Sequence, residues 1–240
     1  MLQTLLDYLY PVRCPVCDEI VLPKGQRICK ECREKLVYIR EPRCKGCSKP
    51  IEYEEQEYCS DCRRKTFHYD GGYAVWVYNE AMRTSVAGFK YRGRKEYAAF
   101  YIRELVRLYG ERIRKLSPDA IVPVPLHRSK YRERGYNQAE VLARGISREL
   151  QLPVYSRLLV RDRKTLPQKK LSDKERRRNL TGAFRVGGHH SGESPSVPER
   201  ILLVDDIYTT GSTVDACSRI LKAHGAKEVY FIVLCIGKGY

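Results

Sequence analysis

Ile201-Leu-Leu-Val-Asp-Asp-Ile-Tyr-Thr-Thr-Gly-Ser-Thr213 is the stretch that decides the fold of this 240-residue chain. Its four aliphatic residues predict a buried strand over 201–204, and the residues that follow it predict a helix over 212–224. Between them stand two carboxylates and a turn rich in hydroxyl groups and glycine. A helix N-terminus presents free N–H groups and the positive end of a dipole, so this turn suits a phosphate. Asp205 and Asp206 would repel a phosphate, and we expect them to accept hydrogen bonds from a vicinal diol such as that of ribose.

The segments around this stretch alternate between strand and helix patterns. We expect strands over 72–78, 120–124, 184–186 and 228–236, and helices over 96–115 and 138–150. Alternation of this kind predicts an α/β fold with a mainly parallel, Rossmann-like sheet and helices on both faces. Ligands of such sheets bind at the carboxyl ends of the strands. The segments that follow strands are therefore the candidate functional loops.

One such segment, 122–138, is strongly basic and follows the predicted strand over 120–124. Arginine can bind phosphate groups with two parallel hydrogen bonds, so Arg128 and Arg134 are candidates to bind a pyrophosphate. The alternative is a solvated basic surface loop in which Asn137 caps the following helix.

A second basic segment, 165–184, contains Lys169 and Arg176 among many other cations. Ser172 and Glu175 resemble a capping box that opens a short helix. From the residues alone, the segment fits either a solvated basic helix or a contact with nucleic acid.

The N-terminal third contains four Cys-x-x-Cys pairs, whose first members recur every fifteen residues. Two such pairs can complete a tetrahedral Cys₄ site, so we predict one or two structural zinc ions. Disulfides and an iron–sulfur cluster are the alternatives, and the spacing leaves open whether the pairs combine sequentially or crosswise. We expect a double zinc-ribbon domain over 1–66, a linker over 63–72, and an α/β domain over 67–240. The predicted ligands are Cys14, Cys17, Cys29, Cys32, Cys44, Cys47, Cys59 and Cys62.

The formal net charge of +16 produces a positive field that attracts polyanions. Basic residues and tyrosines are interspersed in the cysteine-rich third, and this combination suits single-stranded nucleic acid. A structural or protein-docking ribbon with a solvated surface is an equal alternative. The longest apolar run, 229–236, is too short to span a membrane, and the N-terminus has no signal-peptide pattern. We therefore expect a cytoplasmic protein with no membrane span.

The stretch 201–213 resembles the signature of type I phosphoribosyltransferases that binds phosphoribosyl pyrophosphate (PRPP). It departs from that signature at Tyr208, where an aliphatic residue is usual. The resemblance implies that Asp205 and Asp206 bind the ribose 2- and 3-hydroxyls and that magnesium accompanies PRPP. It also implies a pyrophosphate loop that includes Arg128 and Arg134. A mobile loop with Lys169 and Arg176 would close over the site and exclude water. The residues implied to bind the 5-phosphate are Thr209, Thr210, Gly211, Ser212 and Thr213.

Three features narrow the resemblance: the cysteine pairs, Arg134-Gly-Tyr-Asn-Gln138 and Asp205-Asp-Ile-Tyr-Thr-Thr-Gly211, to which Phe89-Lys-Tyr-Arg-Gly93 adds a fourth. With them the chain resembles the ComF family, in its ComFC-like form, over essentially its whole length. The resemblance implies a PRPP-binding, phosphoribosyltransferase-like protein of natural competence. Such a protein would handle imported single-stranded DNA with the translocase ComFA and the membrane channel ComEC, and these partners could place it at the membrane periphery.

The alternative is a GntX-like, active phosphoribosyltransferase of nucleotide or nucleobase metabolism, in which the zinc ribbon is only structural. The sequence identifies no general base and no acceptor pocket, so the catalytic residues are unknown and enzymatic activity stays open. Cys217 and Cys235 lie outside the cysteine pairs, and we expect them to be buried as small hydrophobic residues.

Overall fold

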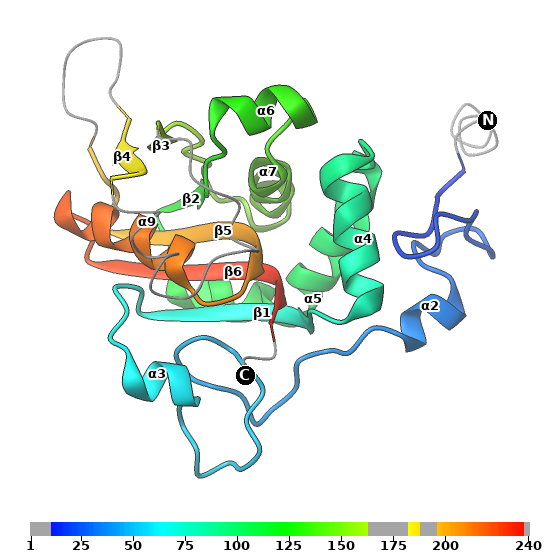
Figure 1. Ribbon diagram of the computed structural model, residues 1–240, viewed down its shortest axis with the longest axis horizontal. Coiled ribbons are helices and arrows are strands. Elements are labelled where there is room, and N and C mark those ends of the chain that lie inside the picture. The colour runs from blue at the N-terminus through cyan, green and yellow to red at the C-terminus, as the bar shows by residue number, and fades with distance from the viewer. Residues whose placement is uncertain (1–10, 163–181, 188–195, 238–240) are drawn as a thin grey trace.

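The structure is a computed structural model that describes residues 11–162, 182–187 and 196–237. Its centre is a four-stranded parallel sheet in the order β1 (Gly71–Val77), β6 (Glu228–Ile236), β5 (Arg200–Tyr208) and β2 (Ala120–Pro123) (Figure 1). The two middle strands, β5 and β6, are nearly continuous in apolar residues, as strands buried on both faces usually are. The predicted α/β fold with a parallel sheet is confirmed.

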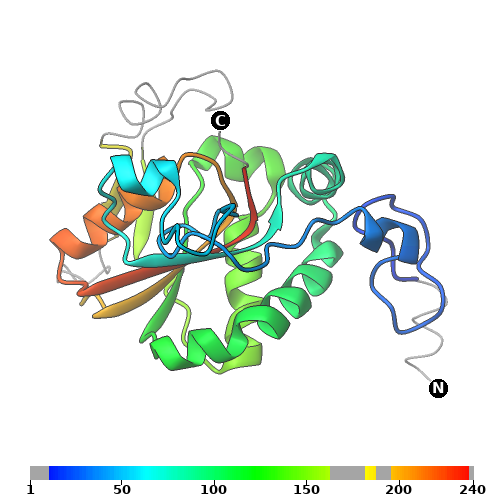
Figure 2. The ribbon, with the colours of Figure 1, turned by 90° about the horizontal axis from the view of Figure 1, so that it is seen from below.

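Helices cover both faces of the sheet, as the alternation predicted. α4 (Glu80–Tyr91), α5 (Ala98–Leu116) and α7 (Gln138–Leu150) pack on one face, and α9 (Ser212–Ala223) packs on the other (Figure 2). A short 3-10 turn (Lys95–Tyr97) precedes α5, so the α-helix begins later than the predicted residue 96.

The predicted strand over 184–186 exists but lies outside the central sheet. β4 (Phe184–Val186) pairs antiparallel with β3 (Leu159–Arg161) to form a separate two-stranded sheet. It lies next to α9 (Figure 1).

The sequence analysis did not predict α4. The side chain of Asn79 begins this helix by accepting a hydrogen bond from Met82 N at 3.0 Å. Met82, Val86 and Phe89 are buried at helical spacing. Gly88 is also buried but adds no apolar side chain, because the helix approaches Tyr97 closely there: a Cβ on Gly88 would lie 3.0 Å from that ring. Close packing thus requires a residue that weakens the sequence signal for the helix.

The end of β5 also differs from the prediction. The strand continues to Tyr208, beyond the expected end at 204, so Asp205 and Asp206 lie within it. Its pairing with β6 continues as far as Tyr208 and Ile236. The backbone of the apolar neighbour β6 offers partners along this length, and the pairing extends the strand past its own apolar residues.

Two segments predicted as loop or linker are more ordered than expected. The basic segment after β2 contains a short helix, α6 (Arg128–Arg134), which ends at Gly135 with φ of +76°. Within 63–72, expected to be a linker, Tyr69 is buried against the α9 face of the sheet. Aromatic residues in a short polar segment can pack onto a core that the sequence does not place nearby.

The cysteine-rich part runs along the outer edge of β1. Ile39 N donates to Val75 O at 2.9 Å, and Val77 N donates to Val37 O at 2.8 Å. Residues 37–39 therefore satisfy backbone groups of β1 that would otherwise form an open sheet edge.

Tyr38, within this contact, anchors the ribbon to α5. Its hydroxyl donates to Glu104 Oε2 at 2.8 Å, and Glu104 is 3% exposed and also paired with Arg107. Two short helices, α2 (Lys30–Glu34) and α3 (Ser60–Arg64), belong to the ribbon. The domain boundary expected between 66 and 67 stays a prediction. Every helix of the described ranges is too short or too polar to cross a bilayer.

Candidate functional site

Asp205 and Asp206 occupy neighbouring positions near the carboxyl end of β5, so their side chains leave opposite faces of the sheet. Asp206 lies on the α4 face, where Lys90 Nζ donates to its Oδ1 at 2.7 Å. Asp205 lies on the α9 face, with Arg161 and Cys217 in its electrostatic surroundings. The backbone N–H of Asp206 donates to Asp205 Oδ1 at 2.8 Å. The site thus holds two close carboxylates, each with a cation on its own side.

The two aspartates differ in how far nearby cations compensate their negative charge. Burial and the charge of Asp206 raise the pKa of Asp205 to about 7, although Lys90 and Arg161 oppose the shift. Burial alone would lower the pKa of Lys90, but Asp206 and Asp205 outweigh it and the pKa of Lys90 is raised. Lys90 is therefore a cation at neutral pH, whereas Asp205 is close to protonation.

Lys90 is a candidate site residue, because its side chain pairs with Asp206, and the sequence analysis missed it. Its stretch, Phe89-Lys-Tyr-Arg-Gly93, contributed to the family resemblance without a role for the lysine. In the sequence, Lys90 could have been recognised only as a lysine next to Phe89 near the end of a helix, and that helix had not been predicted. Without α4, nothing placed this lysine beside β5.

The turn after β5 depends on a glycine and leads directly into α9. Gly211 has φ of +77°, in the left-handed region that favours glycine, and α9 begins at the next residue. Thr210 Oγ1 and Ser212 Oγ are 2.8 Å apart. A Cβ on Gly211 would lie 2.4 Å from the hydroxyl oxygen of Tyr208, so the backbone packs closely on that ring. The first turn of α9 directs N–H groups toward this turn.

Arg134 lies on the α4 side of the site, close enough for its charge to act on Lys90. Arg134 Nη1 donates to Gln138 Oε1 at 2.8 Å, and its guanidinium lies over the Tyr91 ring, 4.9 Å from the centroid. Arg134 Nε and Gln138 Nε2 are buried and have no hydrogen-bond partner among the described residues. Buried donors without acceptors are costly, so both suit a ligand with acceptor oxygens.

Among the other basic candidates, one is exposed at the surface and the rest lie outside the described residues. Arg128 is exposed in the first turn of α6. Lys169 and Arg176 lie outside the described residues, as does the predicted capping box at 172 and 175. The expectation for these residues stays a prediction.

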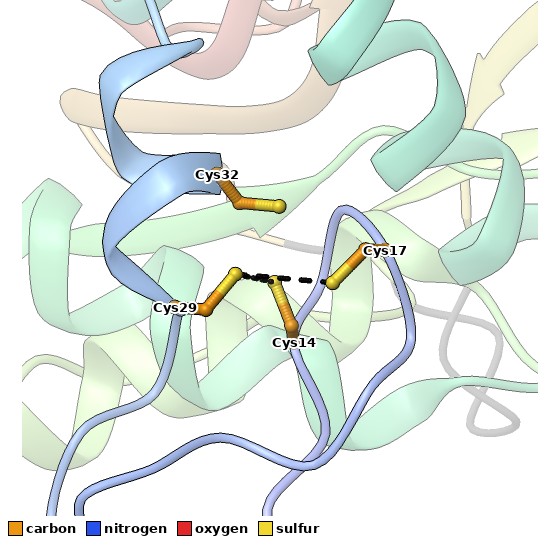
Figure 3. A group of neighbouring side chains, drawn as sticks. All are labelled: Cys14, Cys17, Cys29 and Cys32. Atoms are coloured by element: carbon orange, nitrogen blue, oxygen red, sulfur yellow. Dashed lines mark hydrogen bonds between the residues drawn. The ribbon is translucent and has the colours of Figure 1, made fainter.

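The eight paired cysteines gather in two groups, and within each group all four sulfurs lie within 4.8 Å of one another. The first cysteine group joins the first two Cys-x-x-Cys pairs around α2 (Figure 3), and the second joins the last two pairs around α3. The pairs therefore combine sequentially, which the spacing had left open. The first group is Cys14, Cys17, Cys29 and Cys32, and the second is Cys44, Cys47, Cys59 and Cys62.

The sulfur separations fit structural zinc. A tetrahedral ion with Zn–S bonds of about 2.3 Å holds its sulfurs about 3.8 Å apart. Cys29 Sγ lies 3.6 Å from Cys14 Sγ and 3.8 Å from Cys17 Sγ, and Cys47 Sγ lies 3.6 Å from Cys59 Sγ. All ten cysteines are free of disulfides, and Cys217 and Cys235 are buried as expected.

Comparison with known proteins reproduces this two-part organisation. Residues 5–63 match the double zinc ribbon domain, and residues 132–239 match the phosphoribosyl transferase domain. The chain is 41% identical to "Competence protein F" of Haemophilus influenzae over 112 residues, which are 47% of this chain and 48% of that protein. It is 35% identical to "DNA utilization protein YhgH" of Salmonella typhimurium over 161 residues, 66% of this chain and 68% of that protein.

A third relative, "Competence protein ComFC" of Streptococcus pneumoniae, is 31% identical over 160 residues, which are 65% of this chain and 64% of that protein. The chain therefore spans less than two thirds of the length of the Haemophilus and Streptococcus relatives.

The raised pKa of Asp205 predicts a pH-dependent term in stability. Between about pH 4 and pH 7 the folded protein keeps a proton that the unfolded chain has released. The stability that Asp205 contributes is therefore fully present below about pH 4 and is lost as the pH rises to about 7. We expect the urea-unfolding free energy of wild type, minus that of Asp205→Asn, to decrease from pH 4.5 to pH 7.5. A difference that stays constant or increases would contradict the assignment.

The Lys90–Asp206 pair predicts a coupled stability effect. Lys90→Met leaves the Asp206 carboxylate buried without its cation, and we expect it to lower the urea-unfolding free energy by about 2–4 kcal/mol at pH 7.5. In Lys90→Met/Asp206→Asn no uncompensated carboxylate remains at 206, so the double variant should recover more than half of the loss. If the double variant is no more stable than Lys90→Met, the loss of unfolding free energy does not come from the broken ion pair.

Proposed function

This chain belongs to the ComF family, and from that membership and its geometry we propose that it binds PRPP with magnesium at the carboxyl end of β5 and acts on single-stranded DNA in natural competence. The observation that carries the PRPP proposal is the Asp205–Asp206 pair directly ahead of the Gly211 turn and the N-terminus of α9. This arrangement offers hydrogen-bond acceptors and an anion site within a few residues.

The two carboxylates are proposed to bind the ribose 2- and 3-hydroxyls. Hydroxyl donors satisfy the oxygens of Asp205 and Asp206 without adding charge to a site that already holds a carboxylate with a raised pKa. Lys90 keeps Asp206 oriented and charge-compensated in the unliganded protein. The 5-phosphate would accept hydrogen bonds from the turn that contains Thr209, Thr210, Gly211, Ser212 and Thr213.

Arg134 is proposed to bind the pyrophosphate, because its buried Nε and the neighbouring Gln138 Nε2 are donors that need acceptors. Arg128 would approach the same group from α6, and Lys169 and Arg176 would contribute from the segment 163–181. Magnesium prefers oxygen ligands and is usually bound together with substrate phosphates, where it reduces their charge.

Transfer of the phosphoribosyl group to an acceptor is the second candidate, in the manner of a GntX-like enzyme. In that reaction the bond between ribose C1 and the pyrophosphate oxygen breaks, and pyrophosphate leaves with the electron pair. A lone pair of the acceptor forms the new bond to C1, and a proton carried by the acceptor atom is released to water. The unpartnered donors of Arg134 and Gln138 suit this candidate as they suit binding, because they would also stabilise negative charge on the leaving group. Release of pyrophosphate distinguishes transfer from binding alone.

The DNA part of the proposal is supported by the names of the relatives, "Competence protein" and "DNA utilization protein", and by the charge of +16. Within the ribbon, Tyr53 and Tyr58 are 61% and 43% exposed, and Arg63 and Arg64 are also exposed. Tyr38, in contrast, is used internally against Glu104. We propose that this surface stacks on bases of single-stranded DNA. A ComFA-type translocase and the ComEC channel are the proposed partners, and the cytoplasm is the proposed location.

Calorimetric titration of PRPP with magnesium tests the first part. We expect wild type to bind and Asp205→Asn/Asp206→Asn to lose at least ten-fold in affinity, because the amide groups accept hydrogen bonds from the diol less strongly than carboxylates. Asp119→Asn/Glu199→Gln is the matched control at the opposite end of β5, and it should bind as wild type does. Absence of binding by wild type, or equal binding by all three proteins, would contradict the proposal. Pyrophosphate released on addition of nucleobases would favour the transferase candidate.

Binding of a labelled oligothymidylate tests the second part. We expect affinity to fall steeply as sodium chloride rises, since phosphate contacts release counterions. Tyr53→Ala/Tyr58→Ala should weaken binding about ten-fold or more, because stacking contributes about 1–3 kcal/mol per base. Tyr155→Ala, which truncates a 44% exposed tyrosine beside β2, is the control. Equal losses in both variants would show that the ribbon is not the DNA surface.

A further inference from the structure

We propose that Tyr69 and Tyr208 are positioning residues through which the second cysteine group holds the 209–213 turn in its phosphate-binding conformation. The role of that turn rests on the proposed PRPP function. The coupling itself is a separate matter, because it is built from contacts between described residues.

The two phenols form the central contact. Their hydroxyl oxygens are 2.7 Å apart, and both side chains are buried. The Tyr208 hydroxyl lies so close to Gly211 that a Cβ there would approach it to 2.4 Å. The Tyr208 hydroxyl, which contacts that of Tyr69, therefore lies directly against the one residue of the turn that has a left-handed backbone.

Packing against neighbouring rings fixes the position of the Tyr208 side chain. Its ring stacks on Phe231 of β6 with a centroid distance of 5.1 Å and an interplanar angle of 10°. Tyr69 meets the same ring edge-on at 4.8 Å. Gly72 of β1 provides the space for Phe231, because a Cβ on Gly72 would lie 2.0 Å from that ring. An aliphatic residue, usual at 208 in the PRPP signature, could fill this space but could not reach Tyr69 with a hydroxyl group.

The segment that carries Tyr69 leaves the second cysteine group directly. It follows Cys62 and α3, and Phe67 stacks on Tyr69 with a centroid distance of 4.9 Å. An ion pair between Lys49 Nζ and Asp61 Oδ2, at 2.6 Å, connects α3 to the segment just after Cys47 of the same cysteine group. A change in the second cysteine group would therefore displace the segment that holds Tyr69.

Residues 68–70 of the same segment form polar contacts with both the first and the last turn of α9. His68 N and Nδ1 lie 2.7 and 2.9 Å from Asp215 Oδ1 in the first turn of α9. Lys222, in the last turn, donates to Asp70 Oδ1 at 2.8 Å, and Asp70 Oδ2 accepts from Val229 N at 2.7 Å. The helix whose N-terminus faces the proposed phosphate is thus aligned by residues 68–70.

The first cysteine group is attached to a different part of the fold. Asp18, within its loop, accepts a hydrogen bond from the Tyr97 hydroxyl at 2.7 Å and pairs with Arg94, just ahead of the 3-10 turn that precedes α5. These residues lie on the opposite face of the sheet from Tyr208. The two cysteine groups therefore give an internal comparison, in which only the second should affect the turn.

A double-mutant cycle on the full-length protein tests the tyrosine contact. Tyr69→Phe and Tyr208→Phe keep both rings and remove one hydroxyl each. Loss of the contact should weaken PRPP binding about five-fold in calorimetry and speed hydrogen exchange of the 209–213 amides, since one buried hydrogen bond contributes about 1 kcal/mol. Because each hydroxyl acts through the other, Tyr69→Phe/Tyr208→Phe should be no weaker than either single variant.

Tyr101→Phe is the matched control. Its hydroxyl is also buried and lies 2.6 Å from the Ser85 hydroxyl, but on the other face of the sheet. It should lower the melting temperature without changing exchange at 209–213 or PRPP affinity. Unchanged exchange in both Tyr69→Phe and Tyr208→Phe, or the same increase in Tyr101→Phe, would overturn the proposal. If wild type fails to bind PRPP, the proposed function fails, but the exchange data still decide whether the tyrosines position the turn.

Cysteine variants test the link to the metal-binding group. Cys62→Ser and Cys17→Ser each remove one ligand, and zinc content is measured for both. We expect Cys62→Ser alone to speed exchange at 209–213, and Cys62→His, which restores a ligand, to reverse the effect. Faster exchange of equal size in Cys17→Ser, or no change in Cys62→Ser despite loss of zinc, would show that the second cysteine group does not hold the turn.

Discussion

The site depends on the placement of two adjacent carboxylates at the end of a central strand, with Asp206 buried and Asp205 half-buried. Asp206 is compensated by Lys90 near the end of α4, and Gly88 of the same helix packs closely against Tyr97. Asp205 has Arg161 nearby, yet its pKa is still raised, so its ionised form is incompletely compensated. Such a site gains most from a ligand that brings hydroxyl donors rather than more negative charge, and ribose hydroxyls have that property.

The parts of the fold that sequence predicted are those set by local pattern. The helix over 138–150 and the strand over 228–236 have the predicted bounds, because their apolar spacing and flanking residues act within one element. The end of β5 was wrong because it depends on pairing with β6, and α4 was missed because Gly88 serves a contact with Tyr97. In each case a neighbour distant in sequence decides the local structure.

The candidate site divides in the same way. The Gly211 turn and the Cys-x-x-Cys pairs could be recognised in the sequence, because backbone geometry and metal chemistry require particular residues at fixed spacing. Lys90 and the sequential combination of the cysteine pairs were not, because both depend on how separate segments meet. Tyr208 is an intermediate case: the sequence marked it as a departure from the PRPP signature, and only its contact with Tyr69 gives the departure a physical reason.

The ribbon encloses the β1 edge of the sheet and attaches one cysteine group to each face. The ribbon is therefore packed on the rest of the fold and not joined to it by a flexible linker alone, since residues 37–39 pair with β1 and residues 68–70 align α9. If the second cysteine group favours the conformation of the turn that binds PRPP, thermodynamic linkage requires the converse. Bound PRPP must then strengthen the attachment of that group by the same factor, and any partner that prefers the attached ribbon would bind more tightly when PRPP is present. In this way, occupancy of the site at the carboxyl end of β5 could change the affinity of the ribbon for a partner without a large change of fold.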